Sequence, residues 1–274
     1  MSLRLKLKAS PSTTAAPIDA PVLCPDRLAG LERRAVEGLP VAVGRSSVPL
    51  GDLFHVSGDG SDVIEVEGDL EAFARVGASM SRGRLTVRGS VGPRVAAGMR
   101  GGLLVIEGSA GDYAGEGLAG GLLRIRGDAG DHLAAPPPGA PRGMNRGSIL
   151  VHGHAGRQAA TRMRRGLIAI AGDLGEGAAC GMLAGTLLVF GPIGRGAGAL
   201  LRRGTIVALG GITALPTFLP AGPLRLPFLE IVYDGLVSAG FPVPAGTRRV
   251  PYHRLVGDVS EGGLGEILAP VAAS

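Results

Sequence analysis

A glycine-anchored repeat dominates the middle of the chain and limits what the chain can fold into. The repeat units begin at Gly83, Gly102, Gly121, Gly147, Gly166, Gly185 and Gly204. Successive anchors are 19 residues apart, except for one interval of 26 residues that contains the insertion 135–141. A related but longer unit, residues 63–82, precedes the first anchor. Because one short unit cannot bury its own apolar face, such repeats predict a fold made by stacking.

Each unit has the pattern of a short strand followed by tight corners. Leu, Ile, Val or Ala stands two and four residues after every anchor, an alternation that is typical of a strand with one buried face. Glycine follows at the sixth position of every unit and recurs at the ninth. Small or branched residues recur at the eighth and twelfth positions, and Met or Leu stands three residues before each anchor. The chain therefore turns several corners in each unit and points apolar side chains inward.

The repeat length selects among the stacked architectures. Helix-pair repeats need about 33 residues or more, and the leucine-rich pattern L-x-x-L-x-L-x-x-N is absent from the units. The chain has 48 glycines, and its aromatic residues make up only 3%, so aliphatic side chains must build the core. We predict an all-β protein, a right-handed parallel β-helix made of glycine-rich coils of about 19 residues, with irregular caps at both ends.

Composition divides the chain into three regions. They are an N-terminal capping region at 1–60, the parallel β-helix at 61–211 and a C-terminal capping region at 212–274. The first region is expected to contain a helix over residues 24–36, and the third a helix that starts at Pro227 and ends at Gly240. The large apolar residues of the third region are expected to close the open end of the β-helix, because an uncapped coil would expose strand edges.

The bulk composition narrows the classes of partner. A net charge of +5 permits an anionic partner, but nucleic-acid modules usually add stacking aromatics, and there are three Tyr, six Phe and no Trp. Cys24 and Cys180 have neither a metal-binding spacing nor a disulfide framework. The N-terminal residues lack the apolar core of a secretory signal, and Asp173 and Glu176 interrupt the apolar stretch 166–194. We therefore expect a cytoplasmic protein without nucleic-acid or membrane partners.

Polar residues at two adjacent corners form one candidate site. Asp112 and Asp131 occupy the tenth position of consecutive units, with Tyr113 and His132 at the eleventh. Stacking would bring the two carboxylates within about one strand spacing, about 4.8 Å. A close carboxylate pair can do acid–base work. Other units have Pro, Arg or Glu at that position, which favours hydrogen bonding to turn amides or a subunit interface.

Other motifs carry weaker signals for chemistry. His152 and His154 are two residues apart, but no third ligand is near them in sequence, so a surface or partner contact is favoured over a metal site. The stretch 194–200 has glycines but lacks the phosphate-binding pattern G-x-x-x-x-G-K-[ST], and it keeps the register of a structural corner. No Ser/His/Asp or Cys/His arrangement indicates a nucleophile.

Motifs at both ends of the chain carry a resemblance to a known family. The coils and the trailing residues GDVSEGGLGEIL resemble the C subunit of formylmethanofuran dehydrogenase. The leading residues RLAGL, LP, GR and VPLGDLFHVSG resemble its bacterial counterpart, the C subunit of the formyltransferase/hydrolase complex. The resemblance covers the chain from about Asp26 to Leu268. The C-terminal domain of the glutamate synthase large subunit has similar coils but not these two flanks.

The resemblance implies a function in one-carbon metabolism, in formaldehyde oxidation. The complex of that family moves a formyl group from formyl-tetrahydromethanopterin to a methanofuran-like carrier and hydrolyses it to formate. Its zinc-containing amidohydrolase-like A subunit and its formyltransferase D subunit carry the chemistry, and the B subunit is a further partner. The implied role of this chain is a non-catalytic scaffold that binds no cofactor. Two alternatives stay open: a structural β-helix of a glutamate-synthase-like enzyme, and a small hydrolase using Asp112, Asp131 and His132.

Arginine is concentrated in the later coils. The residues concerned are Arg157, Arg162, Arg164, Arg165, Arg195, Arg202 and Arg203. Several share matching positions of the repeat, so stacked guanidinium groups would repel one another unless acids or an anion lie among them. A solvated rim or an ionic subunit interface is one interpretation. The other, which depends on the resemblance, is a track that holds the poly-acidic tail of the carrier.

Overall fold

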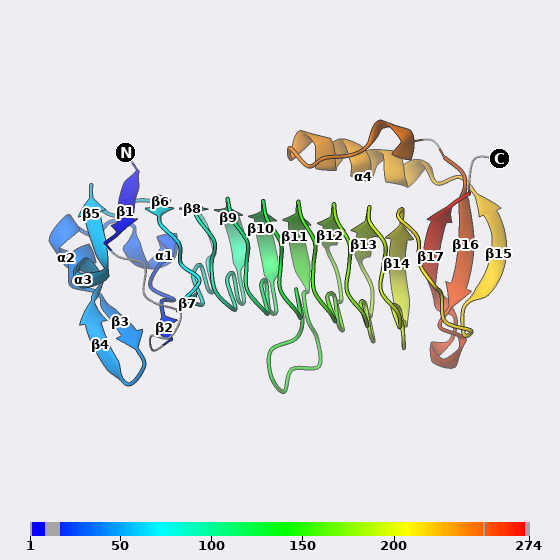
Figure 1. Ribbon diagram of the computed structural model, residues 1–274, viewed down its shortest axis with the longest axis horizontal. Coiled ribbons are helices and arrows are strands. Elements are labelled where there is room, and N and C mark those ends of the chain that lie inside the picture. The colour runs from blue at the N-terminus through cyan, green and yellow to red at the C-terminus, as the bar shows by residue number, and fades with distance from the viewer. Residues whose placement is uncertain (1, 9–16, 249, 272–274) are drawn as a thin grey trace.

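Strands are the main regular secondary structure of the protein, a computed structural model that describes residues 2–8, 17–248 and 250–271. One sheet contains thirteen strands in the order β15-β16-β17-β14-β13-β12-β11-β10-β9-β8-β6-β1-β5. Its middle strands are β6 (Val63–Glu67), β8 (Arg84–Arg88), β9 (Arg100–Ile106), β10 (Ala119–Ile125), β11 (Arg146–Val151), β12 (Leu167–Ile170), β13 (Thr186–Val189) and β14 (Arg203–Ala208). Figure 1 shows these strands side by side in chain order. The all-β prediction is confirmed.

Neighbouring middle strands are parallel and pair in the register that the repeat predicts. Leu85 pairs with Leu104, Leu104 with Leu123, and Leu123 with Ile149, so the second residue after each anchor stacks on its equivalent. All four side chains are fully buried. Such ladders give each strand the apolar contact that it cannot obtain alone.

A second line of pairing joins the turns on another side. Isolated parallel bridges link Leu70, Val91, Ala110, Ala129, Ala155, Leu174, Ile193 and Ile212 in succession. Six of these, from Val91 to Ile193, are the predicted apolar residues at the eighth position. The glycine that follows allows close stacking, because a Cβ atom on Gly92 would lie 2.3 Å from the carbonyl oxygen of Glu71 in the preceding turn. The corner function predicted for these glycines therefore has a steric basis.

The N-terminal region extends the large sheet and adds a small one. The strands β1 (Leu3–Leu7) and β5 (Phe54–Ser57) continue the large sheet beyond β6. The small sheet contains β4 (Ser46–Pro49), β3 (Pro40–Val43), β2 (Ile18–Asp19) and β7 (Phe73–Ala74), and the short helix α3 (Leu50–Leu53) follows β4. The single helix expected over 24–36 is wrong. Two short helices, α1 (Pro25–Leu28) and α2 (Arg33–Glu37), replace it because Ala29 is extended and Gly30 has φ +81°.

The C-terminal region continues the large sheet past β14. The strands are β15 (Leu219–Leu224), β16 (Tyr252–Gly257) and β17 (Leu264–Pro270), with short 3₁₀ turns at Ala245–Thr247 and Val259–Glu261. β17 is parallel to β14 and antiparallel to β16, which pairs in turn with β15. The all-parallel pattern therefore changes to an antiparallel one at this end of the sheet.

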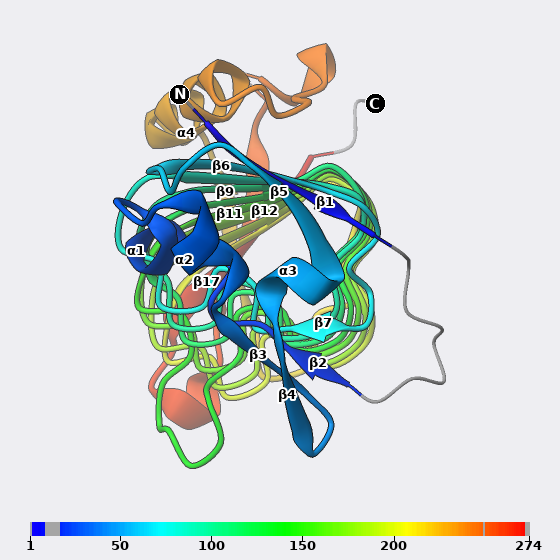
Figure 2. The same cartoon turned by 90° about the vertical axis from the view of Figure 1, so that its left-hand side faces the viewer.

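The predicted C-terminal helix is present, but it lies elsewhere than expected. The helix α4 (Pro227–Ser238) crosses the outer face of the sheet rather than covering its open end (Figures 1 and 2). It packs there because the outward side chains of the later strands are apolar and offer it a long surface. Among the aromatic residues of this region, Phe218 joins the interior core near the end, whereas Tyr233 and Tyr252 belong to the outer cluster under α4.

The insertion at 135–141 forms part of the long loop between β10 and β11. Figure 2 looks along the row of turns and shows this loop protruding away from α4. The loop adds no strand, so the units on either side of it keep their pairing. The division of the chain at residues 60 and 211 stays a prediction, since strands from both flanking regions share the large sheet.

Candidate functional site

The corner carboxylates bind backbone amides of the next turn. An Asp112 carboxylate oxygen accepts the N–H of Asp131 at 2.8 Å, and an Asp131 oxygen accepts the N–H of Arg157 at 2.7 Å. Asp128 accepts the N–H of His154 in the same way, also at 2.7 Å. The carboxylates therefore link successive turns, as the hydrogen-bonding interpretation predicted.

Asp131 is also held in its ionised form. Its second oxygen lies 2.9 Å from the guanidinium of Arg157. The pKa of the Asp131 carboxyl is lowered, first because it accepts the backbone N–H of Arg157 and then because it accepts the guanidinium. A carboxyl group that acts as a general acid near neutral pH needs a raised pKa, so this environment does not suit Asp131 to that role.

The residues at the eleventh position form a stack on the same side of the molecule. The rings of Tyr113 and His132 are 4.6 Å apart and nearly parallel, and the Arg94 guanidinium lies 5.6 Å from the centre of the tyrosine ring. Arg94, Tyr113 and His132 have φ values of 58°, 60° and 62°. This left-handed conformation is repeated from turn to turn, and it directs three side chains onto one outward ladder.

The two histidines of the candidate metal motif contact different neighbours. The Nδ1 atom of His154 accepts the N–H of Asp173 at 2.9 Å. The His152 ring lies 5.2 Å from that of Phe241, and its pKa is lowered by burial and then by the positive charge of Arg126. Over residues 2–8, 17–248 and 250–271, His, Cys, Asp and Glu nowhere gather in a group of three that could hold a metal ion.

The arginines of the later coils lie at separate positions of the repeat. Arg157 and Arg195 occupy the tenth position, whereas Arg164, Arg165, Arg202 and Arg203 immediately precede two anchors, and Arg162 lies four residues before one of those anchors. Arg157 pairs with Asp131, and Arg202 pairs with Glu261 at 2.9 Å. The other five make no ion pair with any residue that the structure describes. The arginines that were predicted to form one track therefore lie at two different corners of the repeat.

The outer face of the sheet provides a larger site that the sequence did not reveal. Beneath α4 lie the outward residues Leu150, Ala169, Leu188 and Val207, one from each of the strands β11 to β14. Leu229, Tyr233 and Leu236 of α4 are buried against this row. On β10, the guanidinium of Arg124 donates to the carbonyl of Ala239 just past the helix. A cation suits this position because the carbonyl end of a helix is partially negative.

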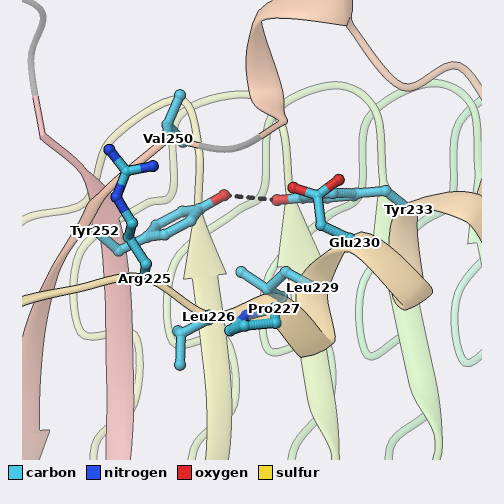
Figure 3. A pocket seen from close by; sticks show the side chains of 8 residues that line it. All are labelled: Arg225, Leu226, Pro227, Leu229, Glu230, Tyr233, Val250 and Tyr252. Atoms are coloured by element: carbon cyan, nitrogen blue, oxygen red, sulfur yellow. Dashed lines mark hydrogen bonds between the residues drawn. The ribbon is translucent and has the colours of Figure 1, made fainter.

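A pocket of about 240 Å³ lies between the start of α4 and β16. Figure 3 shows its lining, in which the hydroxyl groups of Tyr233 and Tyr252 meet at 2.8 Å. Burial raises the pKa of both phenols, so both stay neutral at physiological pH. The pocket walls are mainly apolar, with Arg225 and Glu230 among the lining residues. The paired hydroxyl groups join α4 to the sheet.

Comparison with known proteins relates this geometry to a family. No family model matches the sequence. A crystal structure of the formyltransferase/hydrolase complex from Methylorubrum extorquens, with methylofuran, contains a chain that superposes with a TM-score of 0.90 at 36% sequence identity. The match covers 98% of this chain and 100% of that one. This chain belongs to the C-subunit family of the formyltransferase/hydrolase and formylmethanofuran dehydrogenase complexes.

Sequence alignments with members of the C-subunit family are shorter than the structural match. The C subunit of the Methylorubrum extorquens formyltransferase/hydrolase complex is 39% identical over 77 residues, which are 28% of this chain and 29% of that protein. The C subunit of the tungsten-containing formylmethanofuran dehydrogenase 2 from Methanothermobacter wolfeii is 37% identical over 80 residues, 27% of this chain and 30% of that one. The aligned region thus spans less than a third of these relatives.

In the ranges that the structure describes, no helix is long and apolar enough to span a membrane.

The side chain of Glu116 is almost entirely buried beside Arg94, 3.8 Å from it, and one of its oxygens lacks a hydrogen-bond partner among the described residues. Neither Glu116 nor Arg124 repeats from unit to unit, so the periodicity that identified the core carried no signal for them.

Proposed function

We propose that this chain is the scaffold subunit of a formyltransferase/hydrolase complex and brings no catalytic residue of its own. The full-length likeness to a chain of the Methylorubrum extorquens complex is the observation that carries the proposal. The reaction would convert formyl-tetrahydromethanopterin to formate by way of a methanofuran-like carrier, in one-carbon metabolism in the cytoplasm. The A, B and D subunits of that complex would be the partners, and the zinc would lie in the amidohydrolase-like one.

The architecture suits this role. We infer that the stacked turns form a right-handed parallel β-helix, supported by the parallel register of β6 to β14 and by the second line of bridges. Stacked repeats present long, regular faces on which several partners can bind at once. The described residues that the sequence offered as catalytic, Asp112, Asp131 and His132, are engaged in amide hydrogen bonds and ring stacking.

A second proposal concerns the arginines. We propose that those preceding the anchors, Arg164, Arg165 and Arg203, bind the acidic tail of the carrier. The support is that these guanidinium groups lie at equivalent corners and make no ion pair with described residues. Charge reversal in R164E/R165E should weaken carrier retention by the assembled complex. Unchanged carrier affinity and unchanged assembly would leave the arginines as a solvated rim.

An activity measurement tests the scaffold proposal. Formyl transfer and formate release are measured for the purified chain and for its native complex, each in wild-type form and as D112N/D131N/H132Q. We expect turnover only in the complex, at a rate that the triple substitution leaves unchanged. Turnover by the isolated chain that disappears in the triple variant would instead support the small-hydrolase alternative. Copurification with a glutamate-synthase-like enzyme would support the other alternative, a structural β-helix of such an enzyme.

A further inference from the structure

The outer face of the sheet has a covered half and an open half. Figure 1 shows α4 above β11 to β14 but not above β6, β8 and β9. The open half shares a row of paired residues with the covered one, since Thr86 pairs with Val105, Val105 with Arg124, and Arg124 with Leu150; the register of β10 shifts only at its start. A single row of outward side chains therefore extends from the strands beneath α4 to the strands that α4 does not cover. We call the outer side of β1, β6, β8, β9 and β10 the open face.

The open face carries more positive than negative charge. Its outward cations are Arg4, Lys6, Arg84, Arg88, Arg124 and Arg126, and its outward carboxylates are Glu65, Glu67 and Glu107. The carboxylates are already engaged, because Glu65 contacts both Arg4 and Arg88, Glu67 contacts Lys6, and Glu107 contacts Arg126. The surplus is three cations.

Arg84 and Arg124 hold most of this surplus. Arg84 makes no ion pair with any residue in the described ranges, and its strand lies beside the strand of exposed Val63. Among the described residues, the guanidinium of Arg124 donates one hydrogen bond, to the carbonyl of Ala239. Its Nε atom is buried and has no hydrogen-bond partner among those residues. The pKa of Arg124 is lowered first by burial and then by the positive charges of Arg126 and Arg84. The guanidinium groups of Arg84 on β8 and Arg124 on β10 therefore repel each other across the intervening strand β9.

The open face is also hollowed. A depression on it is lined by Val63, Glu65, Arg84, Thr86, Arg88 and Glu107. Val63 is 42% exposed, and it is the only large hydrophobic residue with such exposure that precedes residue 200 in the described parts of the chain. The hollow combines this exposed apolar side chain with two arginines and two glutamates. Because the open face as a whole carries the surplus of cations, it fits an occupant with an apolar contact and several carboxylates.

We propose that the open face binds an acidic segment of a partner subunit, which lies on the sheet in line with α4. This inference rests on the proposed function, because it names the surface by which a scaffold subunit would hold a partner. Charge complementarity identifies the occupant: its carboxylates would neutralise Arg84, Arg124 and Arg126. α4 shows that this sheet accepts a helix on its outer side, and it leaves the open face free except on β10, where Arg124 donates to the carbonyl of Ala239.

The test is a titration of the full-length chain with the other subunits of its complex, purified without it. The variant R84E/R126E reverses two charges of the open face, and R34E/R45E reverses two exposed charges of the N-terminal region as a matched control. We expect R84E/R126E to weaken partner binding about tenfold or more at low ionic strength and to flatten the salt dependence of binding. The control should match the wild type in both. Equal unfolding midpoints would show that each variant is folded.

Three outcomes would overturn the inference. Partner binding that is equal in R84E/R126E and the wild type would exclude the open face. Self-association of the chain that R84E/R126E abolishes would assign the face to a second copy. Binding of poly-L-glutamate that depends on Arg84, with partner binding unaffected, would assign it to an acidic tail. If the wild-type chain binds none of the subunits, the proposed function fails. If the wild-type chain binds them and R84E/R126E binds them equally well, only the role of the open face is refuted and the proposed function stands.

Discussion

The covered and open halves of the outer sheet face share one backbone and differ in one row of side chains. The central outward residue is Leu150, Ala169, Leu188 or Val207 in the strands under α4, and Glu65, Thr86, Val105 or Arg124 in the strands beyond it. In the first set, apolar burial holds the chain's own helix. The second set is mostly polar: Glu65, Thr86 and Arg124 are partly exposed, and Val105 is buried. The backbone of the stacked turns is therefore the same in both halves, and the outward side chains determine what each half of the sheet face binds.

The covered half should reject a charge that the open half tolerates. Leu188→Asp buries a carboxylate under α4, whereas Thr86→Asp places one beside Arg84 on the same row. We expect L188D to lower the free energy of unfolding by about 4 kcal/mol or to release α4, because a buried charge lacks a partner. T86D should change that energy by about 0.5 kcal/mol or less. Denaturant unfolding measures both, and equal losses would contradict the distinction.

The tyrosine pair should account for much of the attachment of α4. Tyr233 is buried and meets Tyr252 through its hydroxyl group, so Tyr233→Ala removes both packing and a hydrogen bond. We expect a loss of about 3 kcal/mol, with faster hydrogen exchange in α4 than in β12. Tyr233→Phe keeps the ring and should cost about 1 kcal/mol. Exchange that increases equally in α4 and β12 would mean that the helix and the sheet unfold together.

Substitution of Asp131, at a corner of the repeat, should give a smaller and pH-dependent effect on stability. Its pKa is lowered in the folded state, so its stabilising contribution is complete above its unfolded pKa of about 3.9 and is lost as pH falls through the folded value. The stability difference between wild type and D131A should therefore be greatest near neutral pH and shrink below about pH 4. Asp69→Ala, at an exposed position, is the control. A difference that grows on acidification would refute the assignment.

The smallest expected change is a gain. Gly235 lies within α4, is exposed, and has no atom within 4 Å of the place that a Cβ would occupy. Gly235→Ala should stabilise the protein by about 0.5–1 kcal/mol, because alanine loses less conformational freedom in a helix. Ser238→Ala, in the last turn, is the companion variant. A destabilised G235A would show that something packs on the outer side of α4.

The interior was predictable from the sequence because it repeats. Leu104, Leu123 and Ile149 stand at one position of the repeat, and period-2 alternation placed them inside before any contact was known. The fixed spacing likewise predicted that Val91 and Ala110 belong to one stacked apolar track, and a parallel bridge joins them. Local rules plus a fixed spacing sufficed, since each turn contacts only its neighbours.

The outer face was less predictable because its contacts join distant parts of the chain. The alternation showed that Leu188 points outward, but it did not show that Tyr233 covers it. A signal was present: Leu167–Ile170 and Thr186–Val189 are apolar on both sides, which is typical of strands buried on two faces. Arg84 and Arg124 left no such signal, because their importance depends on an unmatched charge that only the arrangement of neighbouring strands reveals.

Native mass spectrometry of material captured through a tag on this chain tests the scaffold role most directly. We expect one assembly in which this chain is bound to formyltransferase and amidohydrolase-like subunits, while the free chain has no formyl-transfer activity. A chain that emerges alone under native conditions and itself transfers or hydrolyses the formyl group would contradict it.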